Sequence, residues 1–353
     1  MKLLEATCSK IFPLDATAQA AAKSRLDQLT MPHWALGRLM DLALELAGIT
    51  GSARPPVARK TVVVMAGDHG VTAEGVSLYP SEVTLQMVLN FVAGGAGINA
   101  LARLVGAQVQ VVDMGVRGDT TALATAGKIT RVHIADGTKN MAVGAAMTRE
   151  QAMRAVEAGI EIALALDATT DVFGTGDMGI GNTTPSSAIV AVLTGEPVAA
   201  VTGKGTGIDE AQLKAKVAVI EKAIAVNKPD AADTLDVLAK LGGFEIAGIA
   251  GLILGAASQR KPVVIDGFIS TAGALVAQGL CAEAANYMIS AHRSVERGHQ
   301  VALAKLGKKP LMDLDLRLGE GTGGALAMNL VEAAVRVLTE VATFGEAGVA
   351  TAE

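Results

Sequence analysis

The 353-residue chain contains few aromatic side chains and few cysteines. Phe, Trp and Tyr make up 3% of it, and its two cysteines, Cys8 and Cys281, show no CxxC or CxxH spacing. Such a pattern indicates neither a disulfide framework nor a zinc site. We therefore expect no metal site and a location in the reducing cytoplasm.

Positive charge and long apolar runs are also scarce. The formal net charge is -5 and the 30 Lys and Arg residues are scattered, so we expect no nucleic-acid partner. The most apolar stretch, 246–257, is shorter than the roughly 20 residues that span a bilayer. The N-terminus reaches Glu5 before any apolar run of signal-peptide length. We expect no membrane span and no secretory signal, and we interpret 246–257 as a buried helix.

Hydrophobic residues are abundant and follow two periods. They make up 50% of the chain, which is enough for a large core and for two domains. Short β-branched runs alternate with long Ala-rich helical stretches, a pattern typical of a parallel sheet built from βα units. The predicted strands cover 61–65, 109–112, 170–173, 197–202, 262–265 and 287–290. In such folds, the loops that follow the strands bind ligands.

Helical patterns dominate both ends of the chain. Before the first predicted strand, residues 14–48 carry leucines at helical spacing, and helical patterns return after residue 294. We predict a large α/β domain over 55–295. Residues 1–54 together with 296–353 are predicted to form a smaller helical domain.

A glycine pattern, Gly174-x-Gly176-x-x-Gly179, follows the third predicted strand and precedes a helix that Thr184 could cap. The pattern matches a dinucleotide fingerprint, which also needs an acid about 20 residues further on, at the end of the next strand. The predicted next strand ends in Gly203-Lys204. We therefore favour a site for one phosphate or carboxylate at a helix N-terminus over NAD binding. A tight packing turn remains the alternative.

Two further loops resemble known sites only in part. Gly203-Lys204-Gly205-Thr206-Gly207 is not a P-loop, because glycine follows the lysine and the four-residue gap is missing. Asp68 and His69 could form an acid–base pair or could order the rim of a site through hydrogen bonds. His292 carries the same ambiguity.

Two acids and a lysine are candidate functional residues. Glu320 is a single carboxylate among glycines, which let the backbone adopt conformations closed to other residues and let a ligand approach. It could instead only complement a helix dipole. Asp177 lies inside the glycine pattern, where it has no helix face to occupy. Lys216, on a helix that Asp209 could cap, looks from the pattern alone like a solvated charge.

Five motifs occur in order along the chain and together carry a family resemblance. They are Gly67-Asp68-His69-Gly70-Val71, Gly181-Asn182-Thr183-Thr184-Pro185, Gly242-Gly243-Phe244-Glu245, Asp266-Gly267-Phe268 and Arg317-Leu318-Gly319-Glu320-Gly321-Thr322-Gly323. With them the chain resembles the nicotinate-nucleotide:dimethylbenzimidazole phosphoribosyltransferase family over nearly its whole length. A set of separate motifs is far more specific than any one of them.

The resemblance implies a homodimer built on a Rossmann-like, mostly parallel six-stranded sheet flanked by helices. A small helical domain from both chain ends would help to cover the partner's site. The resemblance also implies small-molecule substrates and no cofactor. In the implied reaction, nicotinate mononucleotide and 5,6-dimethylbenzimidazole or a related base give α-ribazole 5'-phosphate and nicotinate, in assembly of the nucleotide loop of cobalamin.

Matching the family's motifs also implies a set of site residues. The catalytic glutamate falls on Glu320, and Asp177 falls where relatives usually carry a glutamate. Lys216 could neutralise the substrate phosphate. The implied substrate-binding positions are Tyr79, Gln86, Met87, Gly176, Gly179, Asn182, Thr183, Gly203, Lys216, Phe268, Ser290 and Leu318. Of these, Tyr79, Gln86 and Met87 match the base pocket, which varies between relatives.

The implied chemistry suits these residues. The leaving ring of nicotinate mononucleotide is a pyridinium, so cleavage of its bond to C1' neutralises the ring and needs no general acid. Glu320, taking a proton from the attacking heterocycle, would contribute about 10² to 10⁴ in rate. An anionic Asp177 would stabilise the positive charge that builds on the ribose. Attack opposite the leaving group inverts C1'.

Two departures from the family leave alternatives open. Relatives commonly open with Lys-Pro-x-Gly-Ser-Leu-Gly, whereas this chain has Met31-Pro32-His33-Trp34-Ala35-Leu36-Gly37, and Asp177 is one methylene shorter than the usual glutamate. The acceptor could be dimethylbenzimidazole, another benzimidazole, adenine or a phenol. A nucleotide-binding homologue without turnover is a further alternative, against which the intact Gly319-Glu320-Gly321 argues.

Overall fold

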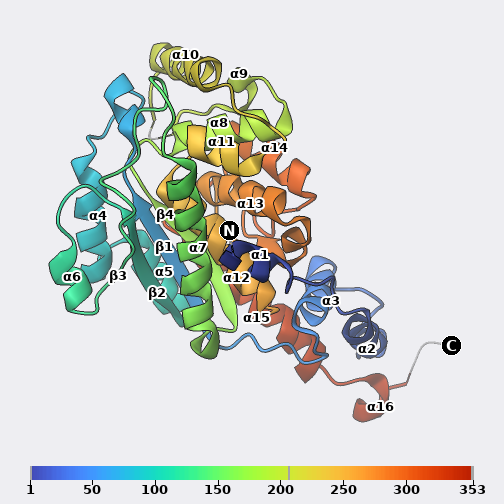
Figure 1. Ribbon diagram of the computed structural model, residues 1–353. Helices are drawn as coiled ribbons and strands as arrows, with labels where there is room; N and C mark the ends of the chain where they lie inside the picture. The colour runs from blue at the N-terminus through green and yellow to red at the C-terminus, as the bar shows by residue number, and fades with distance from the viewer. Residues whose placement is uncertain (1, 206, 351–353) are drawn as a thin grey trace.

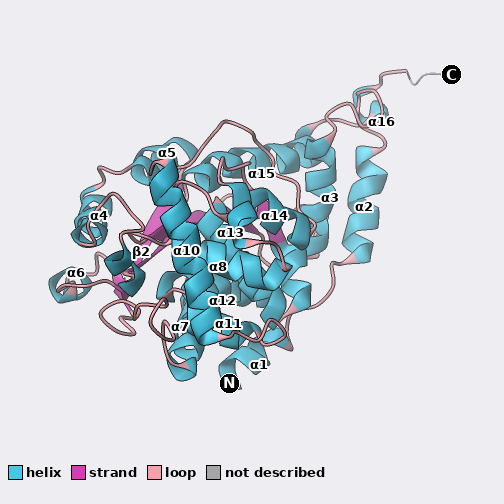
Figure 2. Ribbon diagram, turned by 90° about the horizontal axis from the view of Figure 1, so that it is seen from above, coloured by secondary structure: helices cyan, strands magenta, loops and turns pink. Residues whose placement is uncertain are grey.

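A six-stranded parallel sheet lies at the centre of the computed structural model, which describes residues 2–205 and 207–350 (Figures 1 and 2). Its order is β3-β2-β1-β4-β5-β6, and every pair of neighbours is parallel. The strands are β1 (Lys60–Gly67), β2 (Ala107–Gly115), β3 (Thr130–Arg131), β4 (Val172–Met178), β5 (Val263–Ile265) and β6 (Met288–Ser290). The predicted Rossmann-like sheet is confirmed.

Helices cover both faces of the sheet, and β1 shows why. All eight of its residues are buried. Val63 and Met65 belong to the core on one face, whereas Val62 and Val64 belong to the core on the other. Because alternate side chains of a strand point to opposite faces, such a continuous apolar run needs cover on both sides. The helices α7 (Arg149–Leu166) and α12 (Phe244–Ser258) pack on one face, and α15 (Thr322–Glu340) packs on the other (Figure 1).

The apolar stretch 246–257 lies within α12 and is buried, as predicted. Glycines let α12 approach α7 backbone to backbone. A Cβ atom at Gly251 would lie 1.9 Å from the Val156 carbonyl oxygen, and one at Gly159 would lie 2.1 Å from the Gly248 carbonyl oxygen. Larger residues at these positions would force the two helices apart.

Three details of the predicted secondary structure were wrong. The run 197–202 is a short helix, α9 (Val198–Val201), which begins after Pro197 and packs against α8 (Thr183–Thr194). A short apolar run cannot be assigned to strand or helix by periodicity alone. The sixth strand is instead the two-residue β3. Finally, Gly174 and Gly176 lie inside β4 rather than in a loop after it.

Segments from the two chain ends lie side by side at one end of the molecule (Figure 1). The helices α2 (Ala16–Leu26) and α3 (Arg38–Thr50) pack against α15, and Arg25 donates to the Leu338 and Val341 carbonyl oxygens. However, α1 (Lys2–Cys8) packs against α7 and α12, within the predicted large domain. The division at residues 54 and 296 remains our proposal.

Two short apolar helices follow β1 along the chain. The segment Glu82–Val105 has a mean hydropathy of 1.4 and the length of a membrane span. It is divided into α4 (Glu82–Ala93) and α5 (Gly97–Val105), each shorter than the roughly 20 residues that cross a bilayer. The two cysteines, Cys8 and Cys281, are free thiols.

Candidate active site

A cavity of about 740 Å³ opens beyond the carboxyl ends of β4, β5 and β6. The strand order reverses between β1 and β4, and open α/β sheets bind ligands outside the carboxyl ends of their strands beside such a reversal. The cavity volume lies within the range of small-molecule sites. Its wall is made by parts of segments 76–87, 177–183, 205, 267–269, 292–296 and 315–320.

Most of the predicted site residues line this cavity. They are Tyr79, Met87, Asp177, Gly179, Asn182, Thr183, Phe268, Leu318 and Glu320. The predicted residues outside its lining are Gln86, Gly176, Gly203, Lys216 and Ser290. Four of these five are buried, and Gln86 is exposed on α4.

Glu320 occupies a backbone conformation that its glycine neighbours help to impose. Gly319, Glu320 and Gly321 all have positive φ values, of 81°, 61° and 93°. The Glu320 side chain is buried, and its Oε2 accepts a hydrogen bond from the Ile98 N–H at 3.0 Å, at the N-terminus of α5. A left-handed conformation at a residue other than glycine is strained, and strained residues of this kind cluster at functional sites. The glycines thus serve the turn that carries the carboxylate.

Competing effects act on the pKa of Glu320. Burial raises this pKa, and the nearby Asp266 carboxylate raises it further. The backbone N–H groups of Ile98 and Gly97 lower it, and the net shift is upward. A carboxylate with a raised pKa is a stronger base near neutral pH.

Asp177 lies near the end of β4 and is almost completely buried. Its Oδ1 accepts a hydrogen bond from Asn182 Nδ2 at 3.1 Å. Its Oδ2 is buried without a hydrogen-bond partner among the described residues. Burial and the charges of Asp266 and Glu245 raise the pKa of Asp177 well above its ordinary value. One oxygen of this carboxyl is therefore left without a partner within the fold.

Lys216 is buried rather than solvated. It lies on α10 (Glu210–Asn227), which Asp209 caps as predicted by accepting a hydrogen bond from the Gln212 N–H at 2.8 Å. Lys216 Nζ donates to Thr183 Oγ1 at 2.7 Å and to the Gly203 carbonyl oxygen at 3.4 Å. Burial lowers the pKa of Lys216 to about 8, although the Glu296 charge opposes the shift. Because burial disfavours the charged form of Lys216, an anionic ligand beside it would stabilise that form.

The three predicted glycines permit other segments of the chain to approach their backbone closely. A Cβ atom at Gly176 would lie 2.5 Å from the Glu320 carbonyl oxygen, and one at Gly179 would lie 2.3 Å from the Gly67 carbonyl oxygen. At Gly203 it would collide with Glu296 Oε2 at 1.8 Å. The predicted cap of α8 was wrong, because Asn182 rather than Thr184 precedes the helix and provides no side-chain cap.

Two acids in the site were not predicted as site residues. Asp266, directly after β5, accepts hydrogen bonds from the Gly321 and Gly324 N–H groups at 3.2 and 2.9 Å. Its position after a predicted strand was the available signal. Glu296 lines the cavity, and its Oε1 accepts from the Gly205 N–H at 3.0 Å. No pattern in the sequence distinguished Glu296 from a surface acid.

Asp68 and His69 do not pair with each other. His69 Nε2 lies 2.8 Å from Glu245 Oε1, and both side chains are buried. Asp68 Oδ2 accepts from the Arg117 N–H at 2.8 Å. His292 lines the cavity, and its Nε2 lies 3.6 Å from Asp266 Oδ1.

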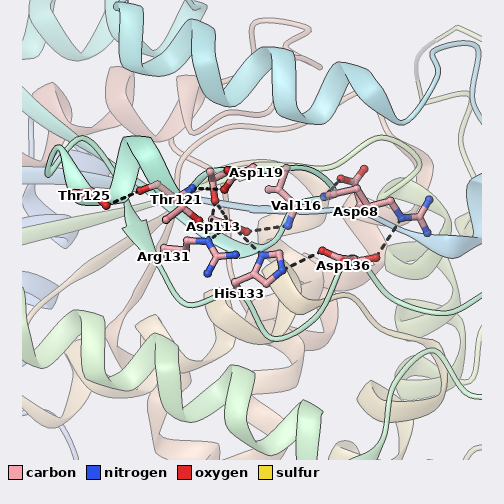
Figure 3. A network of polar contacts seen from close by, with 11 residues as sticks. Asp68, Asp113, Val116, Asp119, Thr121, Thr125, Arg131, His133 and Asp136 are labelled. Carbon is pink, nitrogen blue, oxygen red and sulfur yellow. Dashed lines mark hydrogen bonds and ion pairs between the residues drawn. The ribbon is translucent and has the colours of Figure 1, made fainter.

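A separate polar network fixes the loops beyond β1 and β2 (Figure 3). His133 Nδ1 lies 3.2 Å from Asp113 Oδ2, and its Nε2 lies 3.1 Å from Asp136 Oδ1. Arg117 Nε donates to the Asp136 carbonyl oxygen at 3.2 Å, and the Arg117 N–H binds Asp68. This network orders the polypeptide beside the site, which agrees with the structural role considered for Asp68.

The structure also bears on NAD and metal binding. The strand after β4 is β5, and Asp266 follows it, so an acid does stand at a strand end. Both oxygens of Asp266 already bind backbone N–H groups, and Gly174 and Gly176 lie within β4. The glycine pattern is therefore not the loop of a dinucleotide site. Across residues 2–205 and 207–350, no three His, Cys, Asp or Glu side chains are grouped to hold a metal ion.

Comparisons with known proteins agree with this geometry. The model of a family described as Phosphoribosyltransferase matches residues 11–349. A protein from Syntrophotalea carbinolica named nicotinate-nucleotide–dimethylbenzimidazole phosphoribosyltransferase is 64% identical over 349 residues, which are 99% of each chain. One of the same name from Geobacter sulfurreducens is 58% identical over 353 residues, again 99% of each chain.

A solved structure shows the same fold. The crystal structure of CobT from Thermus thermophilus superposes with a TM-score of 0.91 at 45% sequence identity. The match covers 95% of this chain and 100% of that one. The chain belongs to the nicotinate-nucleotide–dimethylbenzimidazole phosphoribosyltransferase family.

Proposed function

We propose that this protein transfers the phosphoribosyl group of nicotinate mononucleotide to 5,6-dimethylbenzimidazole with inversion at C1'. The products are α-ribazole 5'-phosphate and nicotinate, and the reaction serves assembly of the nucleotide loop of cobalamin. One observation carries the proposal. The site has a buried lysine, Lys216, at one end and two buried carboxyl groups with raised pKa values, Asp177 and Glu320, at the other. Asn182 donates a hydrogen bond to Asp177, and the next residue, Thr183, accepts one from Lys216.

The lysine end suits the phosphate of the nucleotide. Lys216 contacts Thr183, at the first position of α8, and neither Asn182 nor Gly267 provides a side-chain cap for the helix that follows it. Uncapped helix N-termini offer free N–H groups and a positive dipole end to anions. We assign the phosphate to Lys216 and Thr183. Gly203, whose carbonyl oxygen accepts a hydrogen bond from Lys216, and Ser290 stay predicted substrate-binding residues.

The acidic end suits the pyridinium. Asp177 and Glu320 have raised pKa values because they are buried near further carboxylates. A cationic ring beside them would lower both pKa values, since an opposite charge favours the ionised form. Substrate binding would thus prepare the two carboxylates for the reaction. A neutral ligand would supply no positive charge and would leave the pKa values of both carboxyl groups raised.

The reaction then needs one proton transfer. The lone pair of one benzimidazole nitrogen attacks C1' while the bond from C1' to the nicotinate ring nitrogen breaks, and that electron pair neutralises the ring. The other benzimidazole nitrogen loses its proton to Glu320. Asp177, ionised by the substrate, stabilises the positive charge on the ribose in the transition state. Attack from the opposite face yields the α product.

We place the acceptor base near Tyr79, Met87 and Leu318, which line the cavity together with Val83. Methionine adapts its shape to aromatic ligands. Tyr79 and Leu318 are 54% and 61% exposed in the single chain. Exposed apolar side chains at the cavity mouth agree with our proposal that a second copy covers the mouth in a homodimer. In that dimer Gln86, exposed on α4, stays a predicted contact of the base.

The free thiols agree with the proposed cytoplasmic location, because reduced cysteines are typical of that compartment. The alternative acceptors, adenine and phenols, remain candidates beside dimethylbenzimidazole. A homologue that binds the nucleotide without turnover is the other alternative.

The experiment is an incubation of the protein with nicotinate mononucleotide and each of dimethylbenzimidazole, benzimidazole, adenine and phenol. Nicotinate release and the anomeric configuration of the product are measured. We expect equimolar nicotinate and α-ribotide, fastest with dimethylbenzimidazole. A faster reaction with adenine or phenol would reassign the acceptor. Tight calorimetric binding of the nucleotide with no product from any base would support the homologue without turnover.

A further inference from the structure

Asp266 is completely buried beneath the turn that carries Glu320. It follows β5 directly, and its own N–H donates to Thr175 Oγ1 in β4 at 3.1 Å. Both of its carboxylate oxygens accept backbone N–H groups at the start of α15, from Gly321 and Gly324. The chain thus supplies the cap of α15 from a strand more than 50 residues earlier, although Gly321 at the N-cap position has no side chain to do so.

The bond to Gly321 is the one that matters for Glu320. Gly319, Glu320 and Gly321 form a run of three residues with positive φ, and such a run needs external anchors to persist. Two anchors are present among the described residues. The Gly321 N–H is held by Asp266 on one side of Glu320, and the Glu320 carboxylate is held by the Ile98 N–H on the other.

We propose that Asp266 is a positioning residue for the general base, fixing the strained turn around Glu320 and placing a second carboxylate beside it. The inference rests on the proposed function, because it assigns Asp266 to the same reaction. A negative neighbour makes protonation of Glu320 easier, so the charge would strengthen the base as well as fix its position.

The other charged groups around Glu320 do not take this role. Asp177 faces Glu320 from β4, but it is itself buried without a full set of partners. From α5, only the Ile98 and Gly97 N–H groups reach Glu320, and they lower its pKa. His292 faces Asp266 at 3.6 Å and lies against Gly323, where a Cβ atom would be 2.0 Å from His292 Cδ2. Of these groups in the described parts of the chain, Asp266 is the one that contacts both the turn and α15.

The test is the pH dependence of kcat/KM for wild type and Asp266→Asn. In wild type, the acidic limb reports ionisation of Glu320 and Asp177 in the free enzyme, and the Asp266 charge raises the pKa of both carboxyl groups. Removing the Asp266 charge lowers the pKa of Glu320, so we expect the limb to move to lower pH, by about one unit. We also expect kcat on the plateau to fall by roughly tenfold or more, because a weaker and less fixed base removes part of the 10² to 10⁴ that general-base catalysis contributes.

The matched control is Thr175→Val, which removes the hydroxyl that accepts the Asp266 N–H but keeps the carboxylate. It should lower kcat modestly and leave the acidic limb in place. Should Asp266→Asn fail to fold, Asp266→Ser keeps a helix-capping oxygen without the charge and should shift the limb in the same direction. An active variant of either kind with the limb of wild type would overturn the inference while leaving the transferase intact. A wild-type protein without any transfer would remove the proposed function itself.

Discussion

Two buried aspartates stand at the ends of β2 and β4, the strands on either side of β1. Asp113 is saturated with partners. Its Oδ1 accepts from the Val116 N–H at 2.8 Å, and its Oδ2 accepts from Thr120 Oγ1 at 2.6 Å and contacts the His133 ring. Asp177 accepts one hydrogen bond, and its Oδ2 has no partner in the described parts of the chain.

The difference separates a structural acid from a functional one. Both oxygens of Asp113 have partners within the fold, so this side chain stabilises loops and has little to offer a ligand. Asp177 is buried at a cost in free energy that the protein leaves uncompensated. A fold tolerates such a group where a ligand supplies the missing partner. The comparison therefore identifies the β4 end as the reactive one.

Among the variants that test this comparison, Asp177→Asn has the largest expected effect. The change removes the negative charge while keeping the shape and the acceptor oxygen for Asn182. We expect kcat to fall by about 10² to 10³, the loss typical of removing one electrostatic contact to a transition state. The free energy of unfolding should stay level or rise, because a buried and incompletely bonded carboxyl is removed. Steady-state kinetics measure kcat, and urea denaturation measures the free energy of unfolding. A kcat near that of wild type would mean that Asp177 is not a functional acid.

Asp113→Asn should show the opposite profile. The variant leaves Arg131 and His133 without their carboxylate, so we expect the free energy of unfolding to fall by about 3 kcal/mol. Turnover by the folded fraction at low temperature should match wild type, because Asp113 lies outside the cavity lining. Equal loss of turnover in both aspartate variants would mean that the division into structural and functional acids is wrong.

Lys216→Met tests the other end of the site. Loss of a charged hydrogen-bond donor should raise KM for nicotinate mononucleotide by about 10- to 100-fold with a smaller change in kcat. The variant should be no less stable at pH 7, since a buried charge is removed. Lys214→Met, an exposed lysine on the same helix, is the matched control and should leave KM unaltered.

The pKa of Lys216 gives this end of the site a pH dependence. Burial lowers the pKa to about 8, and the Glu296 charge opposes the shift. Lys216 is therefore charged below about pH 8 and loses its proton above it. We expect kcat/KM for the nucleotide to decline as pH rises through this value and the decline to vanish in Lys216→Met. A decline that persists in the variant would assign the titration to another group.

Leu318→Ala should have the smallest effect. Leu318 lines the cavity mouth and is mostly exposed, so its removal takes away one apolar contact. We expect KM for dimethylbenzimidazole to rise by less than about tenfold, the scale of small apolar changes in a pocket. KM for nicotinate mononucleotide should stay constant. A larger change for the nucleotide than for the base would move the acceptor site elsewhere.

Much of the fold was predictable because its signals are local. Buried strands such as β1 are continuous apolar runs, and α12 is an apolar stretch of helical length. The failures also have local causes. The run at 197–202 is β-branched but short, and it packs against α8 through one side while Ala199 and Ala200 are exposed, which suits a helix equally well. The two residues of β3 carry no pattern, because pairing with β2 alone defines them.

Site residues were predictable where glycines surround an acid in the sequence. They were less predictable where the role of a residue depends on its burial in the folded chain. Glu320 was identified from its glycine neighbours and has the positive φ that they permit. Lys216 looks like a surface lysine on an amphipathic helix, and only tertiary packing shows that it is buried. Glu296 and the capping role of Asp266 depend on contacts between distant segments, which no local pattern records.

The most direct test of the central claim is the rate of Glu320→Gln with saturating nicotinate mononucleotide and dimethylbenzimidazole. Glutamine keeps the size of the side chain and an oxygen for the Ile98 N–H, but it cannot take a proton. The account predicts that kcat falls by about 10² to 10⁴ while calorimetric affinity for the nucleotide changes little. Turnover close to that of wild type would contradict the assignment of Glu320 as the base.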